Sequence, residues 1–292
     1  MSRSGPWDVI PDPFDEFNAT AGLRDFAFGA ASLLLILVLT AWLSALSLAQ
    51  ATTPEAALPA ITRAAIVLTG VDGLIEVHAE NLEEQALAGG LIDVPGYPLN
   101  VSVPASEARG DGGAFDQRLL RESLVERSAL LLREEGLAAF RDPGGAITPP
   151  SRFSSAGLLD QLITRLRASE HDRWSSFVTP LGYAAVVLAA AVMLLGVGFG
   201  RLIRLGGAAL IAGALVLIGA LLIRFLFGVL ADDGAIGNEA RSIMDTLASG
   251  PIRNGLLMTI GGAAILLPAL ALDRLFESSD RRAARRASNL DR

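Results

Sequence analysis

Four long runs of apolar residues divide the chain, and each is long enough for a membrane-spanning helix. The runs are 26–49, 178–198, 205–231 and 254–275. A helix needs about 20 apolar residues to cross a hydrocarbon core of about 30 Å. Residues 50–177 are mixed in polarity, as in a soluble domain. The pattern therefore predicts a mainly α-helical, polytopic membrane protein with four transmembrane helices and a small helical extracytoplasmic domain inserted between the first and second spans.

Arginines at the ends of the runs predict their orientation. The turn between the second and third runs holds Arg201 and Arg204 and no acid, and arginine also dominates the end of the chain. Short arginine-rich segments remain in the cytoplasm. We therefore expect the protein to span the lipid bilayer with both termini in the cytoplasm. The expected cytoplasmic segments are the tails 1–25 and 276–292 and the turn 199–204; the expected extracytoplasmic segments are the domain 50–177 and the loop 232–253.

The first apolar run has two interpretations. Ala49-Gln50-Ala51 resembles a signal-peptidase site that follows an apolar core. However, the segment before the run is long and acidic rather than short and basic, and the run has full spanning length. The run is therefore either a retained helix or a cleaved signal, and residues from Thr52 onward lie outside in both cases.

Apolar residues recur every three or four positions in the segments between the runs, which predicts amphipathic helices. Thr53-Pro54 and Thr179-Pro180 each place a helix-capping threonine before a proline that suits the first helical position. Both pairs therefore predict breaks where outer helices meet membrane helices. We expect the outer helices over 54–88, 115–140 and 157–174, with a short one over 238–247.

Residues 89–113 differ from the helical segments because three prolines and several glycines interrupt them. Residues 99–103 alternate in polarity as a short edge strand does. Tyr97, one of two tyrosines in the chain, lies in this segment. The segment is therefore either a recognition loop that contains Tyr97 or a structural connector.

The composition supports membrane insertion and excludes several kinds of catalytic and metal-binding chemistry. The 292 residues are 51% hydrophobic and have a mean hydropathy of +0.46, which is high for a soluble protein. The absence of cysteine excludes disulfides, thiolate catalysis and Cys-ligated metal clusters, and the absence of lysine excludes Schiff-base chemistry. All basic side chains except histidine are arginine, which is typical of GC-rich bacterial coding. We therefore expect a protein of the bacterial inner membrane.

Charged residues outside the spans provide few candidate sites. Asp72, Glu76, Glu80 and Glu84 recur every four residues, with His78 nearby. They form either a divalent-cation site or a solvated helix face. The net charge of −7 and the lack of a dominant basic face predict that no nucleic acid is bound. We expect no resident metal and no cofactor.

Arg224 interrupts the third apolar run, and an ionisable residue within a span is by default a functional hypothesis. It either snorkels to the outer interface, pairs with Asp232 or Asp233, or lines a conduction path. No catalytic motif accompanies it. The sequence therefore predicts a non-enzymatic sensor, scaffold or accessory subunit that acts through a protein partner or self-association of its membrane helices. The alternative is a transporter or channel component that uses spans two to four around Arg224.

Overall fold

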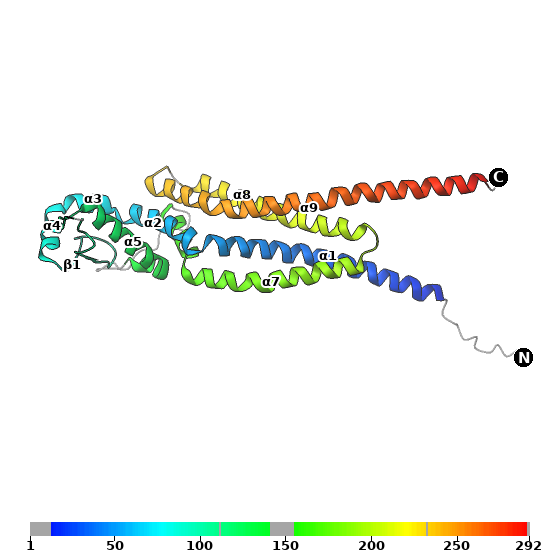
Figure 1. The fold of residues 1–292 in the computed structure, drawn as a ribbon, viewed down its shortest axis with the longest axis horizontal. Helices are drawn as coiled ribbons and strands as arrows, with labels where there is room; N and C mark the ends of the chain where they lie inside the picture. Colours follow the sequence, from blue (N-terminus) through cyan, green and yellow to red (C-terminus); the bar gives the residue numbers. More distant parts are fainter. Residues whose placement is uncertain (1–12, 111, 141–154, 232, 291–292) are drawn as a thin grey trace, which may run out of the picture. The chain divides into compact units, whose positions relative to one another are not determined.

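The computed structural model describes residues 13–110, 112–140, 155–231 and 233–290, and most of them are helical (Figure 1). In chain order the elements are α1 (Pro13–Ala51), α2 (Pro54–Thr69), α3 (Val71–Val77), α4 (Ala79–Ala88), β1 (Leu91–Ile92), β2 (Val103–Pro104), α5 (Gln117–Glu135), the 3₁₀ helix η1 (Gly136–Ala139), α6 (Ser155–Arg165), α7 (Ala168–Leu195), α8 (Gly200–Leu230) and α9 (Ala235–Leu290). The predicted mainly α-helical fold is confirmed.

Within the described residues, four helices are long and apolar enough to cross a bilayer. The qualifying stretches are Gly22–Ala51, Ala168–Leu195, Gly200–Leu230 and Ala235–Phe276. They coincide with the four predicted apolar runs and indicate a multi-pass membrane protein. By length and composition α2 and α3 together also qualify, but they are bent by 49°, and α2 packs into a protein core described below.

The chain divides into two compact units, and α1, α7, α8 and α9 contribute residues to both. Unit 1 comprises the described parts of Met1–Trp42, Pro180–Leu215 and Gly255–Arg292; unit 2 comprises those of Leu43–Thr179 and Val216–Asn254. In unit 1 a small core unites Leu35 of α1, Val192 of α7 and Ala212 of α8. Many other large apolar side chains of this unit are exposed, as expected for helices that face lipid.

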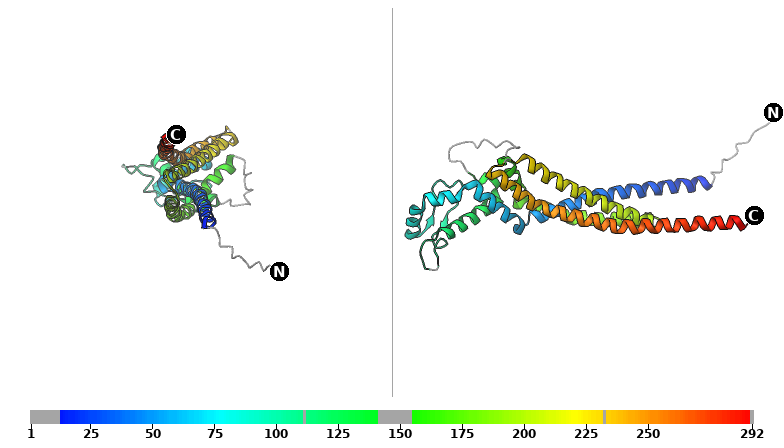
Figure 2. Two further views of the ribbon diagram at one scale, coloured as in Figure 1. Left: turned by 90° about the vertical axis from the view of Figure 1, so that its right-hand side faces the viewer. Right: turned by 90° about the horizontal axis from the view of Figure 1, so that it is seen from above.

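Glycines bring α8 and α9 together in unit 1, where the two helices lie side by side (Figure 2). A Cβ added at Gly206 would lie 2.7 Å from the backbone nitrogen of Leu266, and one at Gly213 would lie 2.6 Å from that of Thr259. Both distances are too short for any side chain. The α8–α9 contact in unit 1 therefore depends on the absence of a side chain at these two positions.

The turn between α7 and α8 differs from the predicted turn at 199–204. Helix α7 ends at Leu195, whose carbonyl accepts a 3.0 Å hydrogen bond from Nε of Arg24. Gly198 then adopts a φ of +57°, which lets the chain reverse before α8 begins at Gly200. Arg201 therefore belongs to α8, because glycines rather than arginines form the turn.

Unit 2 contains two hydrophobic cores that share α5. The large core unites buried residues of α2, α5, α6 and α9, for example Ile61, Leu132, Leu159 and Ile243. The small core unites α3, α4, β1 and the other end of α5. Its fully buried members include Val71, Leu82, Ile92, Val103, Leu120 and Leu124. The segments between the first two apolar spans therefore bury apolar side chains in two cores, one of them shared with α9.

The predicted helix over 54–88 is three helices. Gly70 adopts the left-handed conformation with φ of +58°, and its N–H donates to the Ile66 carbonyl. This ends α2 in the way glycine commonly ends a helix. His78 interrupts the helix again between α3 and α4. The prediction was wrong because apolar periodicity continues across a bend when both sides face a core.

The two threonine–proline pairs behave differently. At Thr53-Pro54 the predicted break occurs, since α1 ends at Ala51 and α2 begins at Pro54. At Thr179-Pro180 it does not, because α7 continues through Pro180. A proline within a helix removes one backbone hydrogen bond without necessarily ending the helix. The break instead lies between Arg165 and Ala168, inside the helix predicted over 157–174.

The final helix is longer than predicted. The short helix over 238–247, the span 254–275 and most of the 276–292 tail form the single helix α9, which leaves little of the expected 232–253 loop. The segment 89–113 contains a small antiparallel pairing of Leu91 with Pro104. Of the strand expected over 99–103, only Val103 belongs to β2.

Candidate functional site

His171, near the beginning of α7, contacts residues at the end of α1. Its Nδ1 lies 3.2 Å from the Thr52 hydroxyl and 3.2 Å from the Ala49 carbonyl oxygen. The Thr52 hydroxyl donates to the Leu48 carbonyl at 2.8 Å, and Thr52 is almost completely buried. The Thr52 hydroxyl donates its proton to a helix carbonyl. The contact between Thr52 and His171 is therefore structural and stabilises the end of α1.

A second polar contact joins α9 to the end of α1. The Asn254 amide donates to the Ser47 hydroxyl at 3.1 Å and to the Gln50 side-chain oxygen at 2.9 Å. Ser47 is 1% exposed, and a buried hydroxyl needs such a partner. An open pocket of about 550 Å³ lies beside this contact, and its lining includes Gln50, Thr53, Thr246, Ser249 and Arg253.

Arg63 joins α2 to α9. Its guanidinium donates to the Ser242 hydroxyl at 3.0 Å, and its Nε lies 3.5 Å from a carboxylate oxygen of Glu239. Thr246 is a further acceptor at 3.5 Å. These groups border the large core, where Ala57, Ala60 and Ala64 of α2 are buried. The small alanines allow close packing, and Arg63 adds charged hydrogen bonds at the margin.

Arg224 has a different partner from those predicted. Its Nε lies 2.7 Å from a carboxylate oxygen of Asp245 on α9, and the two side chains are 49% and 53% exposed. Asp233 instead pairs with Arg241 at 2.9 Å, and Asp232 lies outside the described residues. The candidate Asp245 was missed because it lies 21 residues along the chain, and only the antiparallel pairing of α8 and α9 brings it near.

Tyr97 lies between the two cores of unit 2 and contacts both. Its hydroxyl is 2.7 Å from Oγ of Ser128. The Ser128 hydroxyl donates to the Leu124 carbonyl, so the Tyr97 hydroxyl donates to Ser128. Burial raises the pKa of Tyr97, and contacts with Ser128 and Thr69 offset part of that rise. The recognition-loop interpretation stays a prediction, but the Tyr97 hydroxyl itself is directed into a structural contact.

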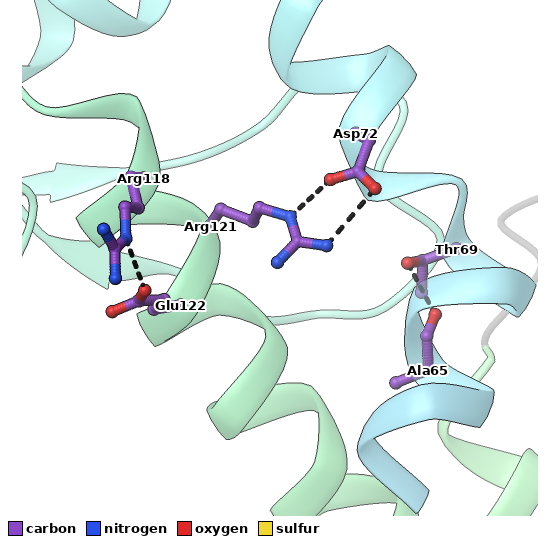
Figure 3. Close-up of polar contacts among 6 residues, drawn as sticks. All are labelled: Ala65, Thr69, Asp72, Arg118, Arg121 and Glu122. Atoms are coloured by element: carbon purple, nitrogen blue, oxygen red, sulfur yellow. Dashed lines mark hydrogen bonds and ion pairs between the residues drawn. The ribbon is translucent and has the colours of Figure 1, made fainter.

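The acidic residues on α3 and α4 are not assembled into a metal site. Asp72 forms a two-pronged ion pair with Arg121 of α5, with 3.3 Å between the longer pair of atoms (Figure 3). This contact lowers the pKa of Asp72. The break at His78 interrupts the single helix on which the four-residue spacing would align these acidic side chains. Within the described residues, no group of three or more His, Cys, Asp or Glu side chains could hold a metal ion.

The contacts at His171 and Asn254 were missed by sequence reasoning. His171 lies seven residues before the run 178–198, and Asn254 is the first residue of the run 254–275, so both lie near the beginning of an apolar run. That position is a usable signal, but it does not identify the partner. No family model, no curated protein and no solved structure matches the chain.

Proposed function

We propose that this chain is a non-enzymatic scaffold or accessory subunit of a membrane assembly, which displays residues 50–177 on the extracytoplasmic side. The observation that carries the proposal is the large core. It unites α2, α5 and α6 with Ala240, Ile243 and Met244 of α9, and α9 continues from there into an apolar span. A core that includes the beginning of an apolar span suits a protein that presents a folded surface to a partner.

The exposed apolar and the acidic side chains of residues 71–93 support a protein partner. Val77, Leu87 and Leu91 are 65–77% exposed, outside the four apolar spans. Residues 71–93 hold six acidic side chains and no arginine. Exposed large apolar residues among like charges are typical of interaction surfaces. The complementary partner would present an apolar surface with basic residues around it.

The test is purification of the tagged chain from its native membrane in mild detergent, followed by mass spectrometry. We expect one protein at fixed stoichiometry, and we expect the double variant Leu87→Ser with Leu91→Ser to lose it. Leu130→Ser is the matched control, because Leu130 is also an exposed leucine of unit 2. Recovery of the wild-type chain alone, at the mass of one or a few protomers, would contradict the proposal.

The proposed orientation places both termini in the cytoplasm of a bacterial inner-membrane protein. The support is Arg201 and Arg204 at the beginning of α8, together with the arginine content of the C-terminal segment. Because the chain lacks cysteine, single cysteines report location without background. At Ser102 and Asn238 they should react with an impermeant thiol reagent on whole cells. At Leu202 and Asn289 they should not, and the opposite pattern would reverse the orientation.

A transporter or channel component is the second candidate, and the Arg224–Asp245 pair favours it. Paired ionisable residues in membrane helices commonly mark ion and substrate paths. Arg224→Leu distinguishes the two functions. Lost flux in vesicles with unchanged assembly would support transport, whereas unchanged flux would support the scaffold.

A further inference from the structure

A pocket of about 570 Å³ lies between α8 and α9 in unit 2. Its apolar lining includes Leu221, Phe225, Phe227 and Met244. Its charged lining consists of Arg224, Arg241 and Asp245. The volume is within the range of small-molecule sites, and the few charged groups in an apolar wall suit an amphiphilic ligand.

The charges in this pocket favour an anion. Asp245 is the single carboxylate in the lining and contacts Nε of Arg224 at 2.7 Å. Arg241 contributes a second positive charge, and its guanidinium donates to the Ala231 carbonyl, Asn238 and Asp233. The Asp233 side chain is 97% exposed, so its charge is well solvated. The lining thus has two guanidinium groups against one carboxylate. Half of the Arg224 side chain remains accessible, so its terminal nitrogens can contact a ligand.

The position of Arg224 along α8 matches the headgroup layer of a bilayer. Residues 205–223 contain no charged side chain, and Arg204 and Arg224 flank them. These 19 residues extend about 29 Å at 1.5 Å per residue, close to the hydrocarbon thickness of about 30 Å. If Arg204 lies at one boundary, Arg224 therefore lies at the other, where lipid phosphates are found.

An exposed apolar stripe on α8 continues from the pocket. Ile218, Leu221, Leu222 and Phe225 are all 46% or more exposed. Their spacing of three, four and seven residues places them on one face of the helix. An acyl chain covers such a stripe without requiring any polar contact.

We infer that this pocket binds a diacyl phospholipid, with its phosphate against Arg224, beside the positive charge of Arg241, and an acyl chain along the stripe Ile218–Phe225. The inference does not depend on the scaffold function. It explains why an arginine interrupts an otherwise apolar helix at this distance from Arg204. It also gives the pocket a ligand that combines the anionic and apolar features of its lining.

The test uses the full-length chain, purified in detergent and depleted of lipid, with native mass spectrometry as the readout. Phosphatidylglycerol should bind with one molecule retained per protomer. Dioleoylglycerol, which lacks the phosphate, and glycerol 3-phosphate, which lacks the chains, should both bind at least about tenfold more weakly, the effect of losing one charged hydrogen bond or more. Equal binding of dioleoylglycerol would overturn the phosphate assignment, and equal binding of glycerol 3-phosphate would overturn the lipid.

Variants separate this site from general lipid adhesion. Arg224→Gln should weaken phosphatidylglycerol binding about tenfold, whereas Arg201→Gln, at an exposed arginine elsewhere on α8, should leave it unchanged. Asp245→Asn should retain or strengthen binding, because it frees Arg224 from its partner. If Arg224→Gln does not fold, Ile218→Ser provides a second test through the acyl stripe. Equal binding by Arg224→Gln and Arg201→Gln would overturn the inference.

Discussion

The same two helices, α8 and α9, are held together in different ways in the two units. In unit 1 their backbones approach at Gly206 and Gly213, where no side chain fits. In unit 2 they are joined by the ion pair of Arg224 with Asp245, and α9 buries Ile243 in the large core. Small residues thus join the helices in one unit, and charged and large apolar residues join them in the other.

The two kinds of contact suit different solvents. Burying an apolar side chain gains little free energy in hydrocarbon, so close packing between small residues holds membrane helices together. In water, burial of large apolar side chains is the main stabilising contribution. Each unit should therefore be most sensitive to a different kind of substitution, and four variants test this from the largest expected effect to the smallest.

Leu132→Ala should have the largest effect. Leu132 is fully buried in the large core, so its truncation should lower the free energy of unfolding by about 2–5 kcal/mol. Leu130 on the same helix is 45% exposed. Leu130→Ala should therefore change the free energy of unfolding by no more than about 0.5 kcal/mol. Denaturant unfolding followed by circular dichroism measures both. Similar losses for the two variants would mean that the large core does not stabilise unit 2.

Gly206→Ala tests the packing in unit 1. The new methyl group would lie 2.7 Å from the backbone nitrogen of Leu266, and such overpacking costs about 1–3 kcal/mol. Gly207→Ala is the neighbouring control, because a Cβ there meets nothing within 4 Å. Thermal unfolding in detergent should show a loss for the first variant and none for the second. Equal melting temperatures would argue against close approach of α8 and α9.

Tyr97→Phe tests the contact between the two cores of unit 2. Loss of the hydrogen bond to Ser128 should cost about 1 kcal/mol at neutral pH. Burial raises the pKa of Tyr97, so its contribution is present below about pH 10 and is lost as the pH rises through the folded-state pKa. Tyr183→Phe, at an exposed tyrosine, is the control. A constant difference between wild type and Tyr97→Phe at alkaline pH would contradict this account.

Asp72→Asn should have the smallest effect. The Arg121 contact lowers the pKa of Asp72, so its stabilisation is present above about pH 4 and disappears as the pH falls through the folded-state pKa. Because the pair is partly exposed, the loss at pH 7 should be about 0.2–1 kcal/mol. Urea unfolding at pH 7 and pH 3 measures the difference, and Glu76→Gln on the same helix is the control. A larger loss of stability at pH 3 than at pH 7 would contradict this account.

Each predicted apolar run overlaps a candidate membrane-spanning helix, because about 20 consecutive apolar residues are a local and redundant signal. Helix ends were less accurate. Gly70 ends α2, but the continuing periodicity suggested one helix, and Pro180 suggested a break that does not occur. A single glycine or proline has several compatible structures, and the neighbouring packing selects one of them.

The sequence by itself determined the number of apolar helices and the existence of a mainly helical segment between the first two. It also restricted the chemistry by omitting cysteine and lysine. Only the tertiary structure decided the partners: Asp245 for Arg224, Ser128 for Tyr97, and Thr52 for His171. Spanning length is a property of consecutive residues, whereas a contact between residues 21 to 119 positions apart depends on how helices pair and where each one bends.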